Sequence, residues 1–373
     1  MPTLHDIIAP IEAAAPRAWQ ESWDNAGWQV CPADPHTTEC TGALLTLDIT
    51  EAAVEEAIRE GFNLVISHHP LLFKGIKRLT GSTPQERIVA TALRHSINLY
   101  SAHTNMDSAP GGVNYRLAER LGLQNIRTLA PRANDLLKLV VYTPHAQADT
   151  VRDALLQAGA GHIGRYDSCS YNAEGYGTFR AASTDCHPYV GEIGQLHREP
   201  ETRTETVVPR HLLGNVLAAL RRVHPYEEPA YDLIPLEMPN PTVGLGCVGD
   251  LAAPLTTADC LQQIARALDI PCLRHSPIAT DHVSRIALCG GAGGEFLGAA
   301  IASGAQLYLT ADLKYHEFQQ GNGQITLVDG GHFETEQQVM DVFSELISKK
   351  LPNFAIHRAT VPSNPVSYLV PSR

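Results

Sequence analysis

The chain is 373 residues long, which exceeds one hydrophobic core of typical size, so we expect two or three domains. Apolar residues make up 44% and charged residues 18% of the sequence, a balance that excludes disordered and fibrous proteins. The formal net charge of -12 disfavours direct binding to nucleic acid. There is no signal-peptide pattern and no apolar stretch of roughly 18 residues, so we expect a cytoplasmic protein that neither spans nor binds a membrane.

The N-terminal third alternates between helix and strand patterns. We expect a helix from about Leu4, a loop over residues 23–30 and a strand over residues 43–48. Further along, a short apolar strand over residues 97–102 precedes a helix over residues 113–121. Apolar strands that alternate with helices are typical of a parallel sheet covered by helices. The predicted fold class is therefore α/β.

Two adjacent histidines end a strand in this region. A threonine is placed to cap a helix over residues 51–60 and a glycine to end it, and an apolar strand over residues 64–66 follows. His68 and His69 come directly after that strand, before a proline. Because successive strand residues point to opposite sides, the two rings can serve two metal ions, or one metal ion and one structural hydrogen bond.

Part of this unit recurs far downstream. Residues 57–67 align without a gap on residues 300–310, with Ala-Ile, Gly, Leu and a terminal hydroxyl in register. We interpret this match as a distant internal repeat; the alternative is that any two strand–helix–strand units align equally well. In the repeat, His69 corresponds to Asp312. Both are then expected at one cleft, outside the carboxyl ends of the strands.

The segment between the two copies has a different pattern. The order strand, helix, strand, strand, helix, strand suggests a ferredoxin-like insert bordered by turn-rich linkers. We therefore assign residues 131–239 to an inserted domain, and residues 1–130 with residues 240–373 to one discontinuous domain. The expected strands are 137–142, 175–182, 207–208 and 231–236, and the expected helices are 148–158 and 209–224.

Further polar side chains gather after other strands. His103 and Asp107 lie in a predicted loop, followed by paired glycines that let the backbone pack closely. His103 is either a site residue or a satisfied core histidine. Near the C-terminus, His332 and Glu336 are spaced i, i+4 at the start of a helix and share one face. Glu334 falls on another face, where we expect a solvated helix charge.

These positions supply three imidazoles and two carboxylates. Such groups suit zinc, iron and related ions, and a carboxylate can bridge two ions. Five ligands exceed what one catalytic zinc needs, so we predict two divalent cations. Zinc or iron is the preferred metal, and manganese is the next choice. Around them, we expect His103 and His316 as proton carriers and Asp312 and Lys314 as partners of the ligands. The predicted ligands are His68, His69, Asp107, His332 and Glu336.

Other chemical motifs are weaker. The glycine run Cys289–Gly294 lacks the Gly-Lys-Ser/Thr of a P-loop and the first glycine of the dinucleotide fingerprint. The helix that follows could still meet a substrate phosphate at its N-terminus. No serine occupies a nucleophile elbow, and the eight scattered cysteines nominate no thiolate catalyst.

Taken together, several motifs resemble the dinuclear-metal family of GTP cyclohydrolase I type 2 homologues, which includes the NGG1-interacting-factor-like proteins. The resemblance covers both outer segments in order. Met106 stands where leucine is more usual and Ala311 where glycine is, and neither is a ligand. The motifs are Trp23-Asp-Asn-Ala-Gly-Trp-Gln-Val30, Ser67-His-His-Pro-Leu-Leu-Phe-Lys-Gly75, His103-Thr-Asn-Met-Asp107 with Gly111-Gly-Val-Asn114, Cys289-Gly-Gly-Ala-Gly-Gly294, Thr310-Ala-Asp-Leu-Lys-Tyr-His316 and Gly331-His-Phe-Glu-Thr-Glu336.

The resemblance implies two similar α/β lobes around a di-metal site whose ligands fall on the same five residues. Longer family members carry an insert that resembles the trimeric PII and CutA proteins, and the stretch from His224 to Tyr231 is similar to its signature. This similarity implies a homohexamer, a trimer of dimers. It establishes no substrate.

Two hypotheses of function follow. The first is a metal-dependent hydrolase, GTP cyclohydrolase-like or phosphoesterase-like, in which a metal-bridging water attacks a nucleotide, phosphoester or cyclic amide. The second is a non-catalytic metal-binding ring protein that binds a partner or a small effector through its PII-like insert. The insert shows no obvious catalytic residue, and the sequence carries no substrate signature. Both features motivate the second hypothesis.

Overall fold

The computed structural model describes residues 1–361 and 363–369 and divides into two compact units. One unit joins Met1–Pro131 to Thr242–Arg373, and the other consists of Arg132–Pro241. The fold is mixed α/β, as the sequence predicted, with three separate sheets. None of the described helices is both long and apolar enough to cross a membrane.

The first sheet has five strands in the order β1-β4-β3-β2-β15. Strands β15, β2, β3 and β4 run parallel, whereas β1 pairs antiparallel with β4. The expected loop over residues 23–30 is wrong in its second half, because Gly27–Val30 finds a partner in β4. The strands are β1 (Gly27–Val30), β2 (Ala43–Thr46), β3 (Leu64–Ser67), β4 (Asn98–Ser101) and β15 (Ile356–Arg358).

Local signals set the helices around this sheet. Helix α2 (Glu51–Glu60) begins where the Thr50 hydroxyl accepts a hydrogen bond from the backbone of Ala53 at 3.1 Å. It ends at Gly61, whose φ of 73° is left-handed, and both predicted ends are confirmed. The other helices in this part of the chain are α1 (Leu4–Ala14), α3 (Pro84–Arg94), α4 (Thr104–Ser108) and α5 (Val113–Arg120).

The second sheet of this unit has six strands in the order β11-β14-β13-β12-β10-β5. Its central strands β12, β13 and β14 are parallel. The bounds are β5 (Gln124–Arg132), β10 (Asn240–Thr256), β11 (Arg274–His275), β12 (His282–Ala292), β13 (Leu307–Ala311) and β14 (Thr326–Asp329), with helices α8 (Thr257–Ala267), α9 (Leu297–Ala302), α10 (His332–Glu336) and α11 (Val339–Lys350).

Apolar residues of both sheets are fully removed from water. One cluster joins α1, α11 and the inner face of the five-stranded sheet, and includes Ile7, Ile66 and Phe343. Another joins α5 and α8 to the six-stranded sheet, and includes Leu117 and Leu309. Strands β3 and β13 are buried along their whole length, so the polar residues that follow them are held on rigid supports.

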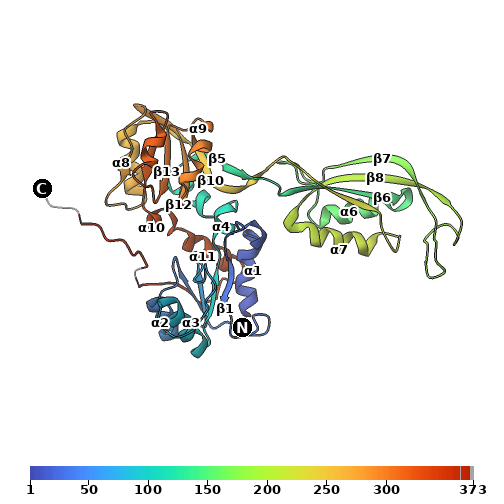
Figure 1. The fold of residues 1–373 in the computed structure, drawn as a ribbon, viewed down its shortest axis with the longest axis horizontal. Coiled ribbons are helices and arrows are strands. Elements are labelled where there is room, and N and C mark those ends of the chain that lie inside the picture. Colours follow the sequence, from blue (N-terminus) through green and yellow to red (C-terminus); the bar gives the residue numbers. More distant parts are fainter. Residues whose placement is uncertain (362, 370–373) are drawn as a thin grey trace. The chain divides into compact units, whose positions relative to one another are not determined.

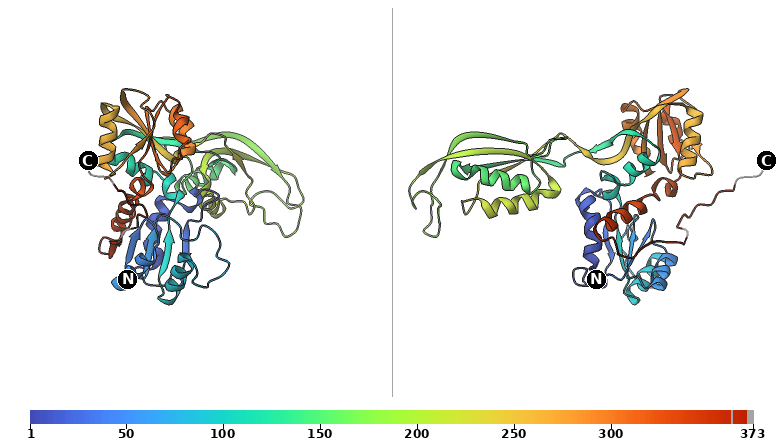
Figure 2. Two further views of the ribbon diagram at one scale, coloured as in Figure 1. Left: turned by 60° about the vertical axis from the view of Figure 1, so that its left-hand side comes forward. Right: turned by 180° about the vertical axis from the view of Figure 1, so that it is seen from behind.

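The Arg132–Pro241 unit contains an antiparallel four-stranded sheet in the order β7-β8-β6-β9. Both of its helices cover one face of the sheet (Figures 1 and 2), where Val141, Leu155, Val208 and Leu220 pack together. In chain order the elements are β6 (Leu136–Pro144), α6 (Ala148–Gln157), β7 (Ser170–Phe179), β8 (His197–Pro209), α7 (Leu213–Val223) and β9 (Tyr231–Pro235), besides short 3-10 turns.

Three predicted bounds in this unit are wrong. The strand expected over residues 207–208 is only the end of β8, which runs over His197–Pro209 because it pairs with both β6 and β7. The strand expected over residues 175–182 lies over Ser170–Phe179, because ten residues of β7 pair with β8 in an unbroken register. The helix expected from residue 209 begins at Leu213, after a 3-10 turn over Arg210–Leu212. Pro209 itself ends β8 in an extended conformation.

Candidate metal centre

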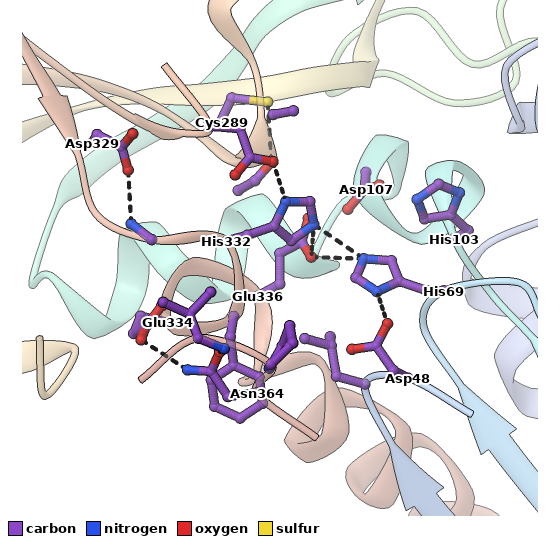
Figure 3. A pocket seen from close by; sticks show the side chains of 18 of the residues that line it. Asp48, His69, His103, Asp107, Cys289, Asp329, His332, Glu334, Glu336 and Asn364 are labelled. Carbon is purple, nitrogen blue, oxygen red and sulfur yellow. Dashed lines mark hydrogen bonds and ion pairs between the residues drawn. The ribbon is translucent and has the colours of Figure 1, made fainter. Parts of the chain in front are cut away.

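The histidine pair lies where β3 ends in the first unit. His68 is fully buried, and its Nδ1 lies 2.9 Å from the carbonyl oxygen of Ala102. That bond requires a hydrogen on Nδ1 and leaves Nε2 as a free acceptor. His69 points to another side, and its Nδ1 lies 2.8 Å from Asp48 Oδ1. Its Nε2 faces the cluster shown in Figure 3.

Asp107 reaches the same cluster from α4. It lies in a short helix rather than in the predicted loop, because its backbone N–H donates to the carbonyl of His103. Asp107 Oδ1 is 3.5 Å from His68 Nε2. The paired glycines allow close packing here as expected, since a Cβ on Gly112 would lie 1.9 Å from the carbonyl oxygen of Met106.

Helix α10 supplies the third side of the cluster. Glu336 Oε2 lies 3.0 Å from the Nε2 atoms of both His69 and His332, and its Oε1 lies 3.9 Å from His68 Nε2. His332 Nε2 is 3.2 Å from His69 Nε2. One carboxylate therefore contacts all three predicted imidazole ligands. Two of them, His69 and His332, are seen beside Glu336 in Figure 3.

The glycine run after β12 packs against this carboxylate. A Cβ on Gly291 would lie 2.1 Å from Glu336 Oε1, and the φ of Gly291 is +62°. Both facts require glycine at that position. The run therefore makes room for Glu336, a role that the sequence analysis did not assign to it.

Carboxylates hold the outer nitrogens of three rings, those of His69, His103 and His332. Asp312 Oδ2 lies 2.7 Å from His332 Nδ1, and Asp24 Oδ1 lies 2.8 Å from His103 Nδ1. With Asp48 on His69, these contacts turn the Nε2 atoms of the rings towards the cavity. Asp312 was predicted as a partner of the ligands. Asp48 and Asp24 were missed, although Asp48 follows β2 and Asp24 belongs to the quoted tryptophan motif.

Two buried atoms in the cluster have no hydrogen-bond partner among the described residues: His68 Nε2 and Asp107 Oδ1. A buried acceptor without a partner is costly. Here two of them converge, as they would on a cation. Three groups of side chains bring their ligand atoms within 4.8 Å of one another: His68, His69 and His103; His69, His332 and Glu336; and His68, Asp107 and Glu336. The donor set therefore fits a metal ion.

Burial and neighbouring charge separate the pKa values in the cluster. Burial lowers the pKa of His68 to about 3, so its ring is neutral, and burial with the nearby Glu336 raises the pKa of Asp107. Although burial opposes the charged forms, hydrogen bonds to carboxylates raise the pKa of His69 to about 10 and that of His332 to about 9. Against its own burial, Glu336 has a lowered pKa because both rings pair with it. Without metal, protons on these rings compensate Glu336, and metal binding has to release them.

The cluster opens into a cavity of about 900 Å³. His69 and Asp312 both line it, as the internal alignment predicted, and so does His103. Trp23 and Phe73 stack on each other at 6.2 Å along its wall. Lys314 and His316 are exposed and are absent from the described lining, so their position gives no support to the predicted roles.

His103 combines the two predicted alternatives. It is 9% exposed and its Nδ1 is paired with Asp24, as in a satisfied core histidine. It also lines the cavity and belongs to one of the possible ligand groups. Glu334 was predicted as solvated, but it is only 6% exposed because Asn364 donates to it at 3.0 Å from the C-terminal segment.

Fold and site together define an α/β protein with a candidate metal centre of imidazoles and carboxylates. The chain belongs to the Duf34/NIF3 (NGG1p interacting factor 3) family, whose profile matches residues 2–365.

Relatives named GTP cyclohydrolase 1 type 2 homolog cover most of the chain. The protein from Halalkalibacterium halodurans is 36% identical over 87% of this chain and 89% of its own. The protein from Bacillus subtilis is 36% identical over 92% of this chain and 91% of its own. A crystal structure of a Bacillus cereus protein related to NIF3 is 36% identical, covers 99% of both chains and superposes with a TM-score of 0.83.

Proposed function

We propose that the chain is a metal-dependent hydrolase that holds two divalent cations. Zinc or iron is the preferred metal, and manganese is the next choice. The observation that carries this proposal is the convergence of His68 Nε2 and Asp107 Oδ1 beside Glu336, two buried acceptors that no described residue hydrogen-bonds. Bound cations would supply Lewis acidity and would lower the pKa of a coordinated water towards neutrality.

The ligand atoms fall into two groups that share Glu336. His68 and Asp107 lie on the side of its Oε1, while His69 and His332 lie on the side of its Oε2. A carboxylate in this position can join two cations and offset part of their charge. We therefore assign His68, His69, Asp107, His332 and Glu336 as ligands.

His103 is the proposed proton carrier. Asp24 holds its Nδ1, so its Nε2 is the atom that can exchange a proton with a group in the cavity. The stacked rings of Trp23 and Phe73 offer a flat wall beside it, which suits a nucleobase or another planar ring. We infer that the substrate is a nucleotide, a phosphoester or a cyclic amide.

We also propose that residues 131–239 form a ferredoxin-like, PII/CutA-like insert and that residues 1–130 and 240–373 form two similar lobes around the metal centre. The four-stranded order β7-β8-β6-β9 with two helices on one face supports the first part. Assembly as a cytoplasmic homohexamer is part of the same proposal. Analytical ultracentrifugation should give six times the chain mass of 40.4 kDa, and a monomer would contradict it.

A turnover screen tests the hydrolase. Protein loaded with zinc, iron or manganese should hydrolyse at least one member of a panel of nucleotides, phosphodiesters and cyclic amides. Glu336→Ala should abolish that turnover, while Glu205→Gln, which changes a carboxylate outside the cluster, should not alter it. Fully loaded protein that is inactive towards all three classes would overturn the proposal.

The second candidate function is a non-catalytic metal-binding ring protein that binds a partner or effector through the Arg132–Pro241 unit. One observation favours it: this unit contains a cavity of its own, which shares no lining residue with the metal centre. Loaded protein that binds through this unit but shows no turnover would support this function over the hydrolase.

A further inference from the structure

The second cavity of the molecule lies within the Arg132–Pro241 unit and has a volume of about 690 Å³. Its floor is the sheet face opposite the helices, where β7 and β8 pair. Gly175 faces Glu201 across the two strands, and Gly177 follows on the same side. Two glycines at alternate positions remove two side chains from this face, which leaves space above the sheet.

Glu201 extends into that space. A Cβ on Gly177 would lie 2.2 Å from Glu201 Oε2, so the carboxylate lies directly over the glycine. Glu201 is only 8% exposed. Its Oε1 accepts a hydrogen bond from the Tyr226 hydroxyl at 2.9 Å, whereas its Oε2 has no hydrogen-bond donor and no cation partner in the described part of the chain. Glu201 Oε2 is therefore open to the cavity and can accept a hydrogen bond from a positively charged group.

The wall of the cavity comes from the motif that starts at His224, which the metal centre does not use. Buried His224 accepts a hydrogen bond at Nδ1 from the backbone N–H of Tyr226 at 3.1 Å, while its Nε2 lies 3.0 Å from the carbonyl oxygen of Tyr142. This double contact fixes the position of Tyr226. Its ring lies 5.6 Å from that of Phe179 and 6.4 Å from that of Tyr189.

The next residue of the motif closes the cavity on another side. Both carboxylate oxygens of Glu227 accept from the backbone N–H of His187 at 3.2 Å, which ties the segment after β7 to the motif. The ring wall and the loop therefore meet over the floor that carries Glu201.

The charge around the cavity is negative. Four glutamates and two arginines line it, and one of the arginines, Arg203, already pairs with Glu205 at 3.0 Å. An anionic ligand such as a phosphate would meet repulsion from this set. A cation would be attracted by the carboxylates and by the faces of the aromatic rings. The four glutamates are Glu174, Glu201, Glu227 and Glu228.

We propose that this cavity binds a small organic cation through an N–H donor on Glu201 Oε2, with the apolar part of the ligand against Tyr226 and Phe179. The ligand class is a primary ammonium or guanidinium compound, because the unpaired oxygen needs a hydrogen as well as a charge. This site is independent of the hydrolase chemistry and gives the second candidate function a defined ligand class. It is tested by binding rather than by turnover, so the two can fail separately.

Calorimetric titration of the full chain tests the proposal with three probes. Butylamine and methylguanidine each carry one positive charge with N–H donors, whereas tetramethylammonium carries the same single charge without a donor. We expect saturable binding of butylamine or methylguanidine and at least about tenfold weaker binding of tetramethylammonium, the loss of one charge-assisted hydrogen bond. No saturable binding of butylamine or methylguanidine would overturn the proposal, and so would equal binding of tetramethylammonium.

Two variants locate the binding site. Glu201→Gln keeps the shape and the acceptor for Tyr226 but removes the charge, and it should weaken amine binding by about tenfold or more. Glu237→Gln is the control, because Glu237 is an exposed carboxylate of the same unit that lies outside the cavity lining. It should leave the affinity within about twofold. If Glu201→Gln folds normally by circular dichroism and binds as tightly as the parent protein, the site assignment is wrong.

Discussion

Glu336 and Glu201 are both buried glutamates that line a cavity, but different groups surround them. Glu336 lies among imidazole nitrogens whose orientation is fixed by Asp48 and Asp312, whereas the one hydrogen bond that Glu201 accepts from a side chain within residues 1–361 and 363–369 comes from a tyrosine hydroxyl. The first arrangement is preorganised for metal ions, because several imidazole nitrogens converge with the carboxylate. The second leaves one oxygen for a single donor group. The type of neighbour, rather than burial alone, distinguishes a metal centre from an organic-cation site.

The largest effect is expected from Gly291→Ala. Its Cβ would collide with Glu336 Oε1, and its left-handed φ disfavours any side chain. Metal affinity should fall by more than the roughly 10–100-fold typical of an outer-shell change. Gly298→Ala in α9 is the matched control, since nothing lies within 4 Å of its added methyl group. Equal metal affinity of both variants, measured by competition with a chelating dye, would show that the glycine run does not shape the site.

Asp48→Asn should have a smaller effect on the same region. The amide preserves the shape but no longer holds the His69 ring with a charge, so we expect metal affinity to fall about 10–100-fold. The five ligands stay in place, and the number of ions bound at saturation should not change. Chelator competition gives the affinity and mass spectrometry gives the number. An unchanged affinity would mean that Asp48 does not orient the ring.

Gly177→Ala separates the second region from the first. Its methyl group would displace Glu201 Oε2, and amine affinity should fall about tenfold, the cost of one charged hydrogen bond. Metal content should be unaffected. Gly214→Ala, where the added methyl group meets nothing within 4 Å, is the control in the same unit. A loss of metal in Gly177→Ala would contradict the independence of the two cavities.

Glu56 is a third buried glutamate, and unlike Glu336 and Glu201 it needs no ligand. Its carboxylate accepts hydrogen bonds from the backbone of Thr360 at 2.8 Å and of Val361 at 3.2 Å, which lower its pKa despite its burial. This stabilisation is fully present above the unfolded pKa of about 4.5 and is lost as the pH falls through the lowered folded value. Glu56→Gln should therefore cost about 1–3 kcal/mol of unfolding free energy at neutral pH and less in acid.

Urea unfolding at several pH values measures this difference. Glu55→Gln on the exposed face of the same helix should change the unfolding free energy by less than about 0.5 kcal/mol. A cost for Glu56→Gln that does not shrink in acid would contradict the assignment of the stabilisation to the ionised carboxylate.

Periodicity and strand ends made much of the metal cluster predictable. His68 and His69 follow an apolar strand, and His332 and Glu336 share a helix face, so their chemistry could be read without coordinates. The carboxylates that hold the outer nitrogens of these rings could not be predicted. Asp48 contacts His69 from the end of a neighbouring strand, and neither segment alone determines that the two strands pair. Glu334 was misjudged for a similar reason, since a segment about thirty residues further on covers it.

The short strand Gly27–Val30 and the second cavity also depend on pairing. Gly27–Val30 is defined by β4 rather than by its own pattern. The cavity needs Gly177 and Glu201 on adjacent strands in one register, and the strand pattern read from the sequence was displaced there.

Metal content of untagged protein, measured by mass spectrometry beside Glu336→Ala and His68→Ala, tests the central claim most directly. We predict about two ions per chain, as in bridged two-metal sites, and fewer in both variants. Folded protein that contains no metal and takes up no added zinc, iron or manganese would contradict the metal centre.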